Sequence, residues 1–205
     1  MLMHERRLSL IDGDTVEVRN LDRQWFSTPD IGRYKAEALA MRLEAEYGIK
    51  IKTSNVYVDD ATTMRDFNKV ILLAVDNHRA RAKVYELVDN AYNHNGVVVI
   101  DCANELESAT ASIYLPEWRG TEHDPRSQFP EINVDNRADD PTKLSCAAKV
   151  SSGEQSAFAN MSAACLGISL LRTWIDRDML HAEETVRNSI PYQHTMNPSH
   201  WRSLV

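Results

Sequence analysis

Acidic residues follow several apolar runs in this sequence, and they are the first side chains that could do chemistry. Asp12 and Asp14 come directly after LSLI, Asp76 follows VILLAV, and Asp101 follows VVVI. A carboxylate at the end of a strand can hold a ribose hydroxyl or Mg²⁺. A single aspartate in such a place more often caps a turn or a helix. Several of them at neighbouring strand ends favour a ligand site instead.

Two basic residues stand near the first pair of acids. Arg23 lies in the polar stretch that follows them, and Lys35 lies at the start of a predicted helix. An arginine can bind phosphate oxygens through two parallel hydrogen bonds. A lysine in the first turn of a helix adds positive charge where anions are already favoured. Acids and cations in this combination suit a nucleoside triphosphate.

The segments between these residues predict a mostly parallel α/β sheet flanked by helices. Apolar residues repeat at helical spacing over 36–47, where Gly48 is placed as a stop, and again from residue 78 onwards. Residues 49–58 alternate as a half-buried strand does, whereas the runs that end at Asp76 and Asp101 predict strands buried on both faces. Because strands alternate with helices, we expect ligands beyond the carboxyl ends of the strands.

The second half of the chain has three predicted segments. Residues 117–145 are rich in Pro, Asp, Asn and Arg without any period, which predicts a long surface crossover loop. The stretch GEQSAFANMSAACLGISLLRTWI then predicts a long helix with small residues on several faces. Residues 181–205 form a tail that either wraps a surface or a partner, or is loosely ordered. The main domain is therefore expected to cover residues 1–180.

Composition excludes several classes of function. The net charge of −7 comes without any basic stripe, so nucleic acid is not an expected partner. No apolar stretch is long enough to span a bilayer, so no membrane association is expected. Three widely spaced cysteines without a CxxC pair predict neither zinc nor a disulfide framework, and they favour a reducing, cytoplasmic setting.

One family combines these features. The stretch IDGDTVEVRNLDRQ, then DIGRYKAEAL, and the VDN of 75–77 resemble the ThiF/MoeB/HesA family, relatives of the ubiquitin-activating enzymes. The helix EQSAFANMSAACLGI resembles the closing helix of that family. The LSC of 144–146 before it is most similar to the ThiF proteins of PRTRC systems. The resemblance covers about residues 8–175.

The resemblance implies a Rossmann-like adenylating domain and a reaction. Members of the family use ATP and Mg²⁺ to activate the C-terminal carboxylate of a small ubiquitin-like protein or peptide as an acyl adenylate. A thiol then often takes over the acyl group. Relatives form homodimers or heterodimers, so a dimer is an expected state. The two CxxC pairs that hold structural zinc in many members are absent from this sequence.

The resemblance also assigns a role to each residue of the first motif. Asp12 would bind the ribose hydroxyls. Asn20 and Arg23 would contact the phosphates, with Arg23 stabilising charge on the transferring group. Gln24 would shape the same loop, and Lys35 would reach the phosphates.

Further roles fall on residues outside that motif or beside it. Asp76 would hold Mg²⁺, which neutralises and aligns the triphosphate. Asp14 is expected to order the loop rather than to contact nucleotide. Cys146 is either the acyl-accepting thiol or a small residue in a loop before a helix. Cys102 and Cys165 are expected in the core.

One element of the family pattern is missing. The first strand and the G-x-G-G-x-G loop of the family should precede the stretch at residue 8, yet no two of the seven glycines form a G-x-G. Backbone amides cradle phosphates closely only where glycines permit it. If Met1 is the true start, we expect the chain alone to bind ATP weakly or not at all.

Three explanations for the missing loop remain open. The chain is a fragment of a longer enzyme, or another chain supplies the loop, or the protein is a non-catalytic subunit or scaffold that pairs with an active partner. Retention of the acids and cations favours an active site completed by residues not in this chain. A dinucleotide oxidoreductase is a weaker alternative, because N-L-x-R-Q is not part of its fingerprint.

Overall fold

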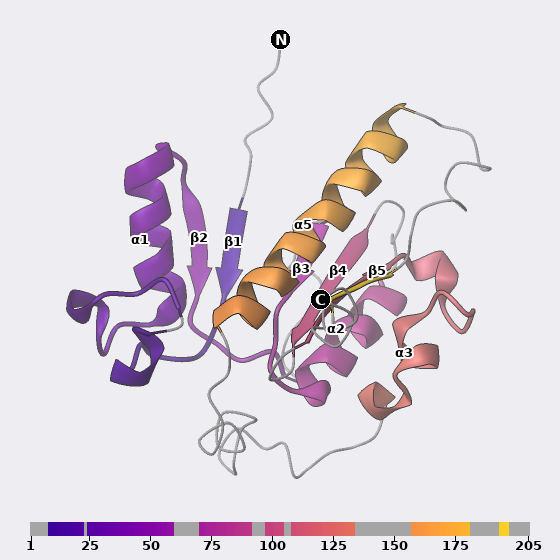
Figure 1. The fold of residues 1–205 in the computed structure, drawn as a ribbon, viewed down its shortest axis with the longest axis horizontal. Helices are drawn as coiled ribbons and strands as arrows, with labels where there is room; N and C mark the ends of the chain where they lie inside the picture. Colours follow the sequence, from indigo (N-terminus) through magenta and orange to yellow (C-terminus); the bar gives the residue numbers. More distant parts are fainter. Residues whose placement is uncertain are drawn as a thin grey trace, which may run out of the picture. The chain divides into compact units, whose positions relative to one another are not determined.

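The computed structural model describes residues 8–22, 24–59, 70–91, 97–104, 108–133, 157–180 and 193–196. The chain forms two compact units, residues 1–68 and residues 69–205. In Figure 1 the first unit is coloured indigo to purple and the second magenta to yellow.

The first unit is a single β-α-β crossover. Strand β1 (Leu8–Ile11) pairs in parallel with β2 (Ile51–Ser54), and helix α1 (Lys35–Tyr47) connects them along the chain. Ala36 and Ala40 lie on the buried side of α1, at helical spacing. The parallel arrangement agrees with the sequence prediction for this half.

Helix α1 has the boundaries that the sequence predicts. It begins at Lys35, and it ends where Gly48 takes a left-handed conformation with φ of 64°. The Gly48 N–H donates to the carbonyl of Glu44 at 3.0 Å, which satisfies one of the free carbonyls of the last turn. Glycine adopts this conformation without the steric cost that a Cβ imposes.

Two short 3₁₀ helices, η1 (Val18–Asn20) and η2 (Thr28–Asp30), lie in the segment between β1 and α1. Val16 fixes this segment to the residues just before α1. Its N–H donates to the carbonyl of Arg33 at 2.8 Å, and its carbonyl accepts from Gly32 at 2.9 Å. The Val16 side chain is also buried. Both backbone hydrogen bonds and apolar packing therefore hold the segment in place.

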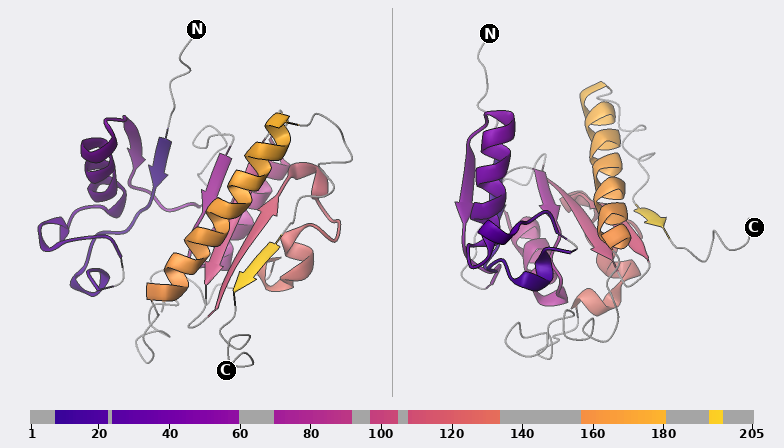
Figure 2. Two further views of the ribbon diagram at one scale, coloured as in Figure 1. Left: turned by 45° about the horizontal axis from the view of Figure 1, so that its top comes forward. Right: turned by 60° about the vertical axis from the view of Figure 1, so that its left-hand side comes forward.

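The second unit is a four-stranded mixed sheet in the order β3-β4-β5-β6 (Figure 2). Strands β3 (Val70–Leu73) and β4 (Val98–Asn104) are parallel. Strands β5 (Ala109–Tyr114) and β6 (Gln193–Met196) follow in antiparallel pairing. The sequence analysis did not identify the β5 strand, and the β6 strand falls within the expected tail.

Helices α2 (His78–Asp89) and α5 (Ala157–Leu180) cover the two faces of this sheet. On one face, Asp101 of β4 bonds to side chains of α2. On the other, α5 packs on β4 and β5 (Figure 2). Its Leu170 shares a buried cluster with five residues of the sheet region: Val98, Ile100, Ala111, Ile113 and Leu115.

Two expectations about the buried strands are wrong. Strand β3 is buried on only one face: Ile71 and Leu73 are buried, whereas Leu72 is 50% exposed. The reason is that α5 packs mainly on β4 and β5, so within the described residues it leaves Leu72 half exposed. Strand β4 does not end at Asp101 but continues to Asn104, so Asp101 lies within the strand.

The described part of the expected crossover loop is a set of short helices joined by turns. It contains η4 (Pro116–Trp118), α3 (Pro125–Gln128) and η5 (Pro130–Asn133). The side chains of Asp124 and Ile132 in this segment are buried. The described part of the segment is therefore packed against the protein and is not a freely exposed loop. Within the described residues, no helix is both long enough and apolar enough to cross a membrane.

Candidate functional site

The first candidate residue, Asp12, lies where the sequence predicts it, directly after β1. Its N–H continues the pairing with β2 by donating to the carbonyl of Ser54 at 3.1 Å. Its carboxylate Oδ1 accepts from the N–H of Asp14 at 2.8 Å. This local bond turns the chain away from the strand and holds the Asp12 carboxylate at the strand end, where ligands of α/β sheets bind.

Asp14 joins the strand end to the start of α1. Lys35 Nζ donates to its Oδ2 at 2.7 Å, and the Tyr57 hydroxyl donates to its Oδ1 at 2.9 Å. The Lys35 N–H also donates to the Asp14 carbonyl at 2.9 Å. The contacts agree with the expected role of Asp14 in ordering the loop, and they bring Lys35 to the same strand end as Asp12.

The electrostatics of Asp14 favour its ionised form. Burial raises its pKa, but the hydrogen bond and charge of Lys35, together with the Tyr57 hydroxyl, outweigh burial and lower the pKa below its ordinary value. The ion pair is half-accessible, with the side chain of Lys35 15% exposed and that of Asp14 47% exposed. An ammonium group has three donors, so Lys35 retains capacity for a second anionic partner.

Tyr57 is a residue that the sequence analysis missed. Besides its bond to Asp14, its ring packs over Gly13, where an added Cβ would lie 2.8 Å from Cδ2 of the ring. Any larger side chain at Gly13 would displace the tyrosine. The glycine between two aspartates in DGD was the available signal for a close approach of this kind.

Asn20 and Gln24 are linked through the η1 turn. Asn20 is 3% exposed, and its Oδ1 accepts from the N–H of Glu17 at 2.8 Å. The Gln24 N–H donates to the Asn20 carbonyl at 2.9 Å. Gln24 Oε1 is buried without any hydrogen-bond partner in the described part of the chain. A buried acceptor of this kind is costly unless a ligand or water satisfies it.

Two of the predicted site residues lie outside the described residues. They are Arg23, between Asp22 and Gln24, and Cys146, in the segment 134–156. The phosphate role of Arg23 and the thiol role of Cys146 therefore stay predictions.

Asp76 belongs to the second unit. It lies three residues beyond β3, is exposed, and its Oδ1 accepts from the Asn77 side chain at 3.2 Å. Asn77 in turn caps α2, because its Oδ1 accepts from the N–H of Ala80 at 2.8 Å. An accessible carboxylate at this place has the chemistry of a Mg²⁺ ligand. No group of three or more metal-binding side chains occurs among the described residues.

Asp101 is not available to a ligand. Its Oδ1 accepts from Arg81 Nε at 2.9 Å and its Oδ2 accepts from the Tyr85 hydroxyl at 2.8 Å. All three side chains are buried. Burial raises the pKa of Tyr85, and the Asp101 charge adds to the shift. The expectation that Asp101 faces a ligand at a strand end is therefore wrong, and its role is to hold α2 on the sheet.

The two described cysteines differ. Cys102 packs against the apolar cluster beneath α5, as expected, and burial together with the Asp101 charge raises the pKa of its thiol to about 11. Cys165 is exposed on α5, so its expected place in the core is wrong.

The polar groups of the first unit have the chemistry to bind a nucleotide. Asp12 can accept from ribose hydroxyls, Lys35 can donate to phosphate oxygens, and Gln24 offers an unpaired acceptor. Mg²⁺ on a nucleotide keeps several waters and takes one or two carboxylates in addition to phosphate oxygens. A single exposed aspartate such as Asp76 fits that coordination.

Comparison with known proteins identifies the class. Residues 2–142 match the ThiF family, and the chain belongs to this family. Its fold is the Rossmann-like α/β fold of the solved structures that it matches. No curated protein sequence is significantly similar to the chain.

The solved structures that match share the fold at low identity. A crystal structure of E. coli MccB with ATP has a TM-score of 0.58 and 18% identity, over 93% of this chain and 56% of that chain. A structure of selenomethionine PaaA has a TM-score of 0.57 and 18% identity, over 93% and 61%.

A structure of E. coli MccB with AMPCPP and MccA has a TM-score of 0.59 and 18% identity, over 93% and 56%. The chain thus spans a little over half the length of the MccB and PaaA chains that it matches.

Proposed function

We propose that the protein is an ATP-dependent adenylyltransferase that activates the C-terminal carboxylate of a small ubiquitin-like protein or a peptide. The observation that carries this proposal is the arrangement at the end of β1, where Asp12 and Lys35 meet through Asp14. Membership of the ThiF family supports it. MccB, a structural neighbour, was solved with ATP and with AMPCPP and MccA.

The proposed reaction is a displacement at the α-phosphorus of ATP. An oxygen of the substrate carboxylate forms a bond to that phosphorus, the bond to the bridging oxygen of the β-phosphate breaks, and pyrophosphate leaves. The product is a mixed anhydride of the acyl group and AMP. Both partners are anionic, so the protein must bring positive charge to the reacting phosphates.

Residues of the first unit would divide the binding of ATP among them. Asp12 would accept from the ribose hydroxyls, and Arg23 and Asn20 would contact the phosphates. Lys35 would donate to phosphate oxygens while it keeps its bond to Asp14. Gln24 would shape the same loop, and its unpaired Oε1 would accept a hydrogen bond from the ligand or from a water.

Asp76 would contribute a carboxylate to Mg²⁺, which would offset the charge of the triphosphate. Residues outside the printed sequence would supply the glycine-rich phosphate loop. Cys146 would receive the acyl group as a thioester if the reaction continues beyond adenylation. The protein would act in the cytoplasm as a homodimer or heterodimer.

ATP–pyrophosphate exchange tests this proposal. The full-length protein, with Mg²⁺, ATP and a peptide ending in Gly-Gly as the probe, should incorporate labelled pyrophosphate into ATP. Arg23→Ala and Asp76→Ala should abolish the exchange. Asp22→Ala is the matched control, because it removes an exposed charge next to Arg23, and it should leave the exchange intact. Normal exchange in both site variants would rule out the proposed roles.

A second candidate is a non-catalytic subunit that pairs with an active relative. Family membership is compatible with it, because the match over residues 2–142 establishes the family and not a catalytic activity. This candidate requires no nucleotide affinity in the isolated chain. Tight ATP binding by that chain would count against it, whereas exchange that appears only with a copurifying partner would support a shared site.

A further inference from the structure

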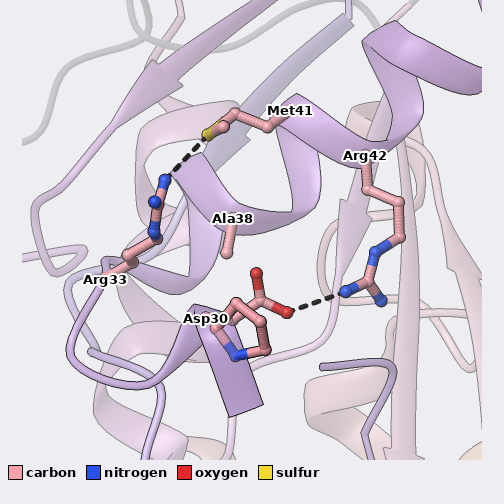
Figure 3. Close-up of a pocket in the computed structure, with 6 residues that line it drawn as sticks. Asp30, Arg33, Ala38, Met41 and Arg42 are labelled. Carbon is pink, nitrogen blue, oxygen red and sulfur yellow. Dashed lines mark hydrogen bonds and ion pairs between the residues drawn. The ribbon is translucent and has the colours of Figure 1, made fainter. Parts of the chain in front are cut away.

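An open hollow lies on the first unit, between η2 and α1, and Figure 3 shows its lining. Its volume is about 320 Å³. Half of the lining comes from the turn before α1 and half from α1 itself: Pro29, Asp30, Arg33, Ala38, Met41 and Arg42. None of the proposed nucleotide-binding residues is among them.

The two arginines of the hollow lie on opposite sides of Ala38 and differ in their partners (Figure 3). Arg42 Nη2 pairs with Asp30 Oδ2 at 2.7 Å, Arg42 donates to the carbonyl of Trp25, and its guanidinium lies 4.9 Å from the centroid of the Trp25 ring. Its charge is thus neutralised and its donors are largely used.

Arg33 interacts more weakly with its surroundings: its charge acts on Asp30, whose ion pair is with Arg42. Its Nη1 donates to Met41 Sδ at 3.3 Å, and a thioether is a weak acceptor. Within the described residues, no carboxylate lies within ion-pair distance of Arg33. A guanidinium with this environment retains most of its capacity to bind an acid through two parallel hydrogen bonds.

Apolar surface lies beside the Arg33 guanidinium. Met41 is 56% exposed, although methionine gains free energy from burial. Ala38 forms the base of the hollow, and Pro29 belongs to the rim. Methionine adapts its shape to different partners, which is a frequent property of binding surfaces.

We propose that this hollow binds a glutamate side chain of an acidic segment in a partner protein. The carboxylate would bond to Arg33, and the two methylene groups would cover Met41. A basic side chain would face two arginines and only one acid, which is already paired with Arg42. A free inorganic anion would leave the apolar surface uncovered, so a side chain with an apolar stem complements the hollow better. This docking surface does not depend on the proposed adenylation.

Two short peptides test the proposal. The probe is a fluorescein-labelled Ala-Leu-Glu-Leu-Ala, amidated at its C-terminus, and the comparison peptide has Gln in place of Glu. Fluorescence anisotropy with the full-length protein should show about threefold to fivefold tighter binding of the Glu peptide, the range for an exposed ion pair. Arg33→Gln should remove this difference between the peptides.

Arg172→Gln is the matched control, because it removes the same charge from an exposed arginine of α5. It should keep the preference for the Glu peptide. Met41→Ser should weaken both peptides equally, which separates the apolar contribution from the ionic one. Equal binding of the two peptides to the unaltered protein, or no binding of either, would overturn the proposal. So would an equal loss in the two arginine variants, or displacement by inorganic phosphate as effective as by the Glu peptide.

Discussion

The two units of the chain differ in what is buried in them. Among the described residues of the first unit, the buried apolar side chains are small: Val16, Ala36, Ala38 and Ala40. The second unit encloses large ones, among them Tyr85, Tyr114, Ile100, Ile113 and Leu170. Because hydrophobic stabilisation grows with buried apolar area, the second unit holds its fold by its core. The first depends more on hydrogen bonds and ion pairs around its loops.

The same comparison explains which charged residues are open to ligands. In the second unit, Arg126 bonds to Asp89 and Asp124 and lies over the Tyr114 ring, and all of these groups are largely buried. These charges serve the fold. In the first unit, Asp12 and Lys35 are only partly buried, so charge there remains accessible to a bound molecule. The charges around Arg126 are thus closed to a ligand, whereas those at the end of β1 are open to one.

The largest effect should come from breaking the buried ion pair of the second unit. Arg126→Met leaves the buried carboxylates of Asp89 and Asp124 without the cation that they share, so we expect a loss of about 3–5 kcal/mol in the free energy of unfolding. Amide hydrogen exchange of β4 and β5 measures it. Asp176→Asn, which removes an exposed i,i+4 pair on α5, should cost below about 0.5 kcal/mol. Equal costs would show that burial does not distinguish these pairs.

Truncation of the core should be nearly as costly. Leu170 is fully buried against the sheet, and Leu170→Ala should lower the free energy of unfolding by about 2–5 kcal/mol. Ile168 lies on the same helix, and its side chain is 55% exposed. Ile168→Ala should therefore change the free energy of unfolding by about 0.5 kcal/mol or less. Urea denaturation compares the two. A loss at Ile168 as large as at Leu170 would contradict the assigned packing of α5.

A tight contact between α5 and β4 should give the next effect. A Cβ at Gly167 would lie 2.4 Å from Cys102 Sγ, so Gly167→Ala should destabilise by about 1–3 kcal/mol. Alanine favours a helix over glycine by about 1 kcal/mol, and the clash must exceed that gain. Adding Cys102→Ala to this variant removes the sulfur and should restore part of the lost stability. Thermal denaturation of the single and double variants measures the recovery. No recovery in the double variant would place the clash elsewhere.

The smallest effect should come from the first unit and should depend on pH. Asp14 has a lowered pKa in the folded state. Its ion pair with Lys35 therefore stabilises the fold above the ordinary carboxyl pKa near 4, and the contribution disappears as pH falls through the lowered value.

Lys35→Met should flatten this acid dependence of amide exchange at α1, at a cost below about 1 kcal/mol near neutral pH. Arg172→Gln, which alters an ion pair of the second unit, should leave it unchanged. An acid dependence that is identical in the unaltered protein and in Lys35→Met would remove Lys35 as its cause.

What the sequence predicts well is local. Helix α1 and its end at Gly48 follow from helical spacing and from the conformational freedom of one glycine. The place of Asp12 follows from the end of one apolar run. Strand β5 and the exposure of Leu72 depend on which elements pair and which helix covers which face, and neither is encoded in a short window of sequence.

The wrong or missing predictions among the candidate site residues also arise from contacts between distant parts of the sequence. Tyr57 reaches Asp14 across 43 positions of sequence, and no spacing rule connects them. Asp101 looks like Asp12 in sequence, because each follows an apolar run. Only the partners that α2 brings to Asp101 show that its carboxylate is already satisfied.

The most direct test of the adenylation proposal is ATP binding by the full-length protein, purified together with any chain that accompanies it, before and after Asp12→Ala. Isothermal titration with Mg-ATP should show binding that Asp12→Ala weakens by about tenfold or more, in line with the loss of a charge-assisted hydrogen bond. Asp22→Ala, an exposed acid in the same loop region, should bind ATP as the unaltered protein does. Equal ATP affinity in the Asp12 and Asp22 variants, or no ATP binding at millimolar concentration, would contradict a nucleotide site at the end of β1.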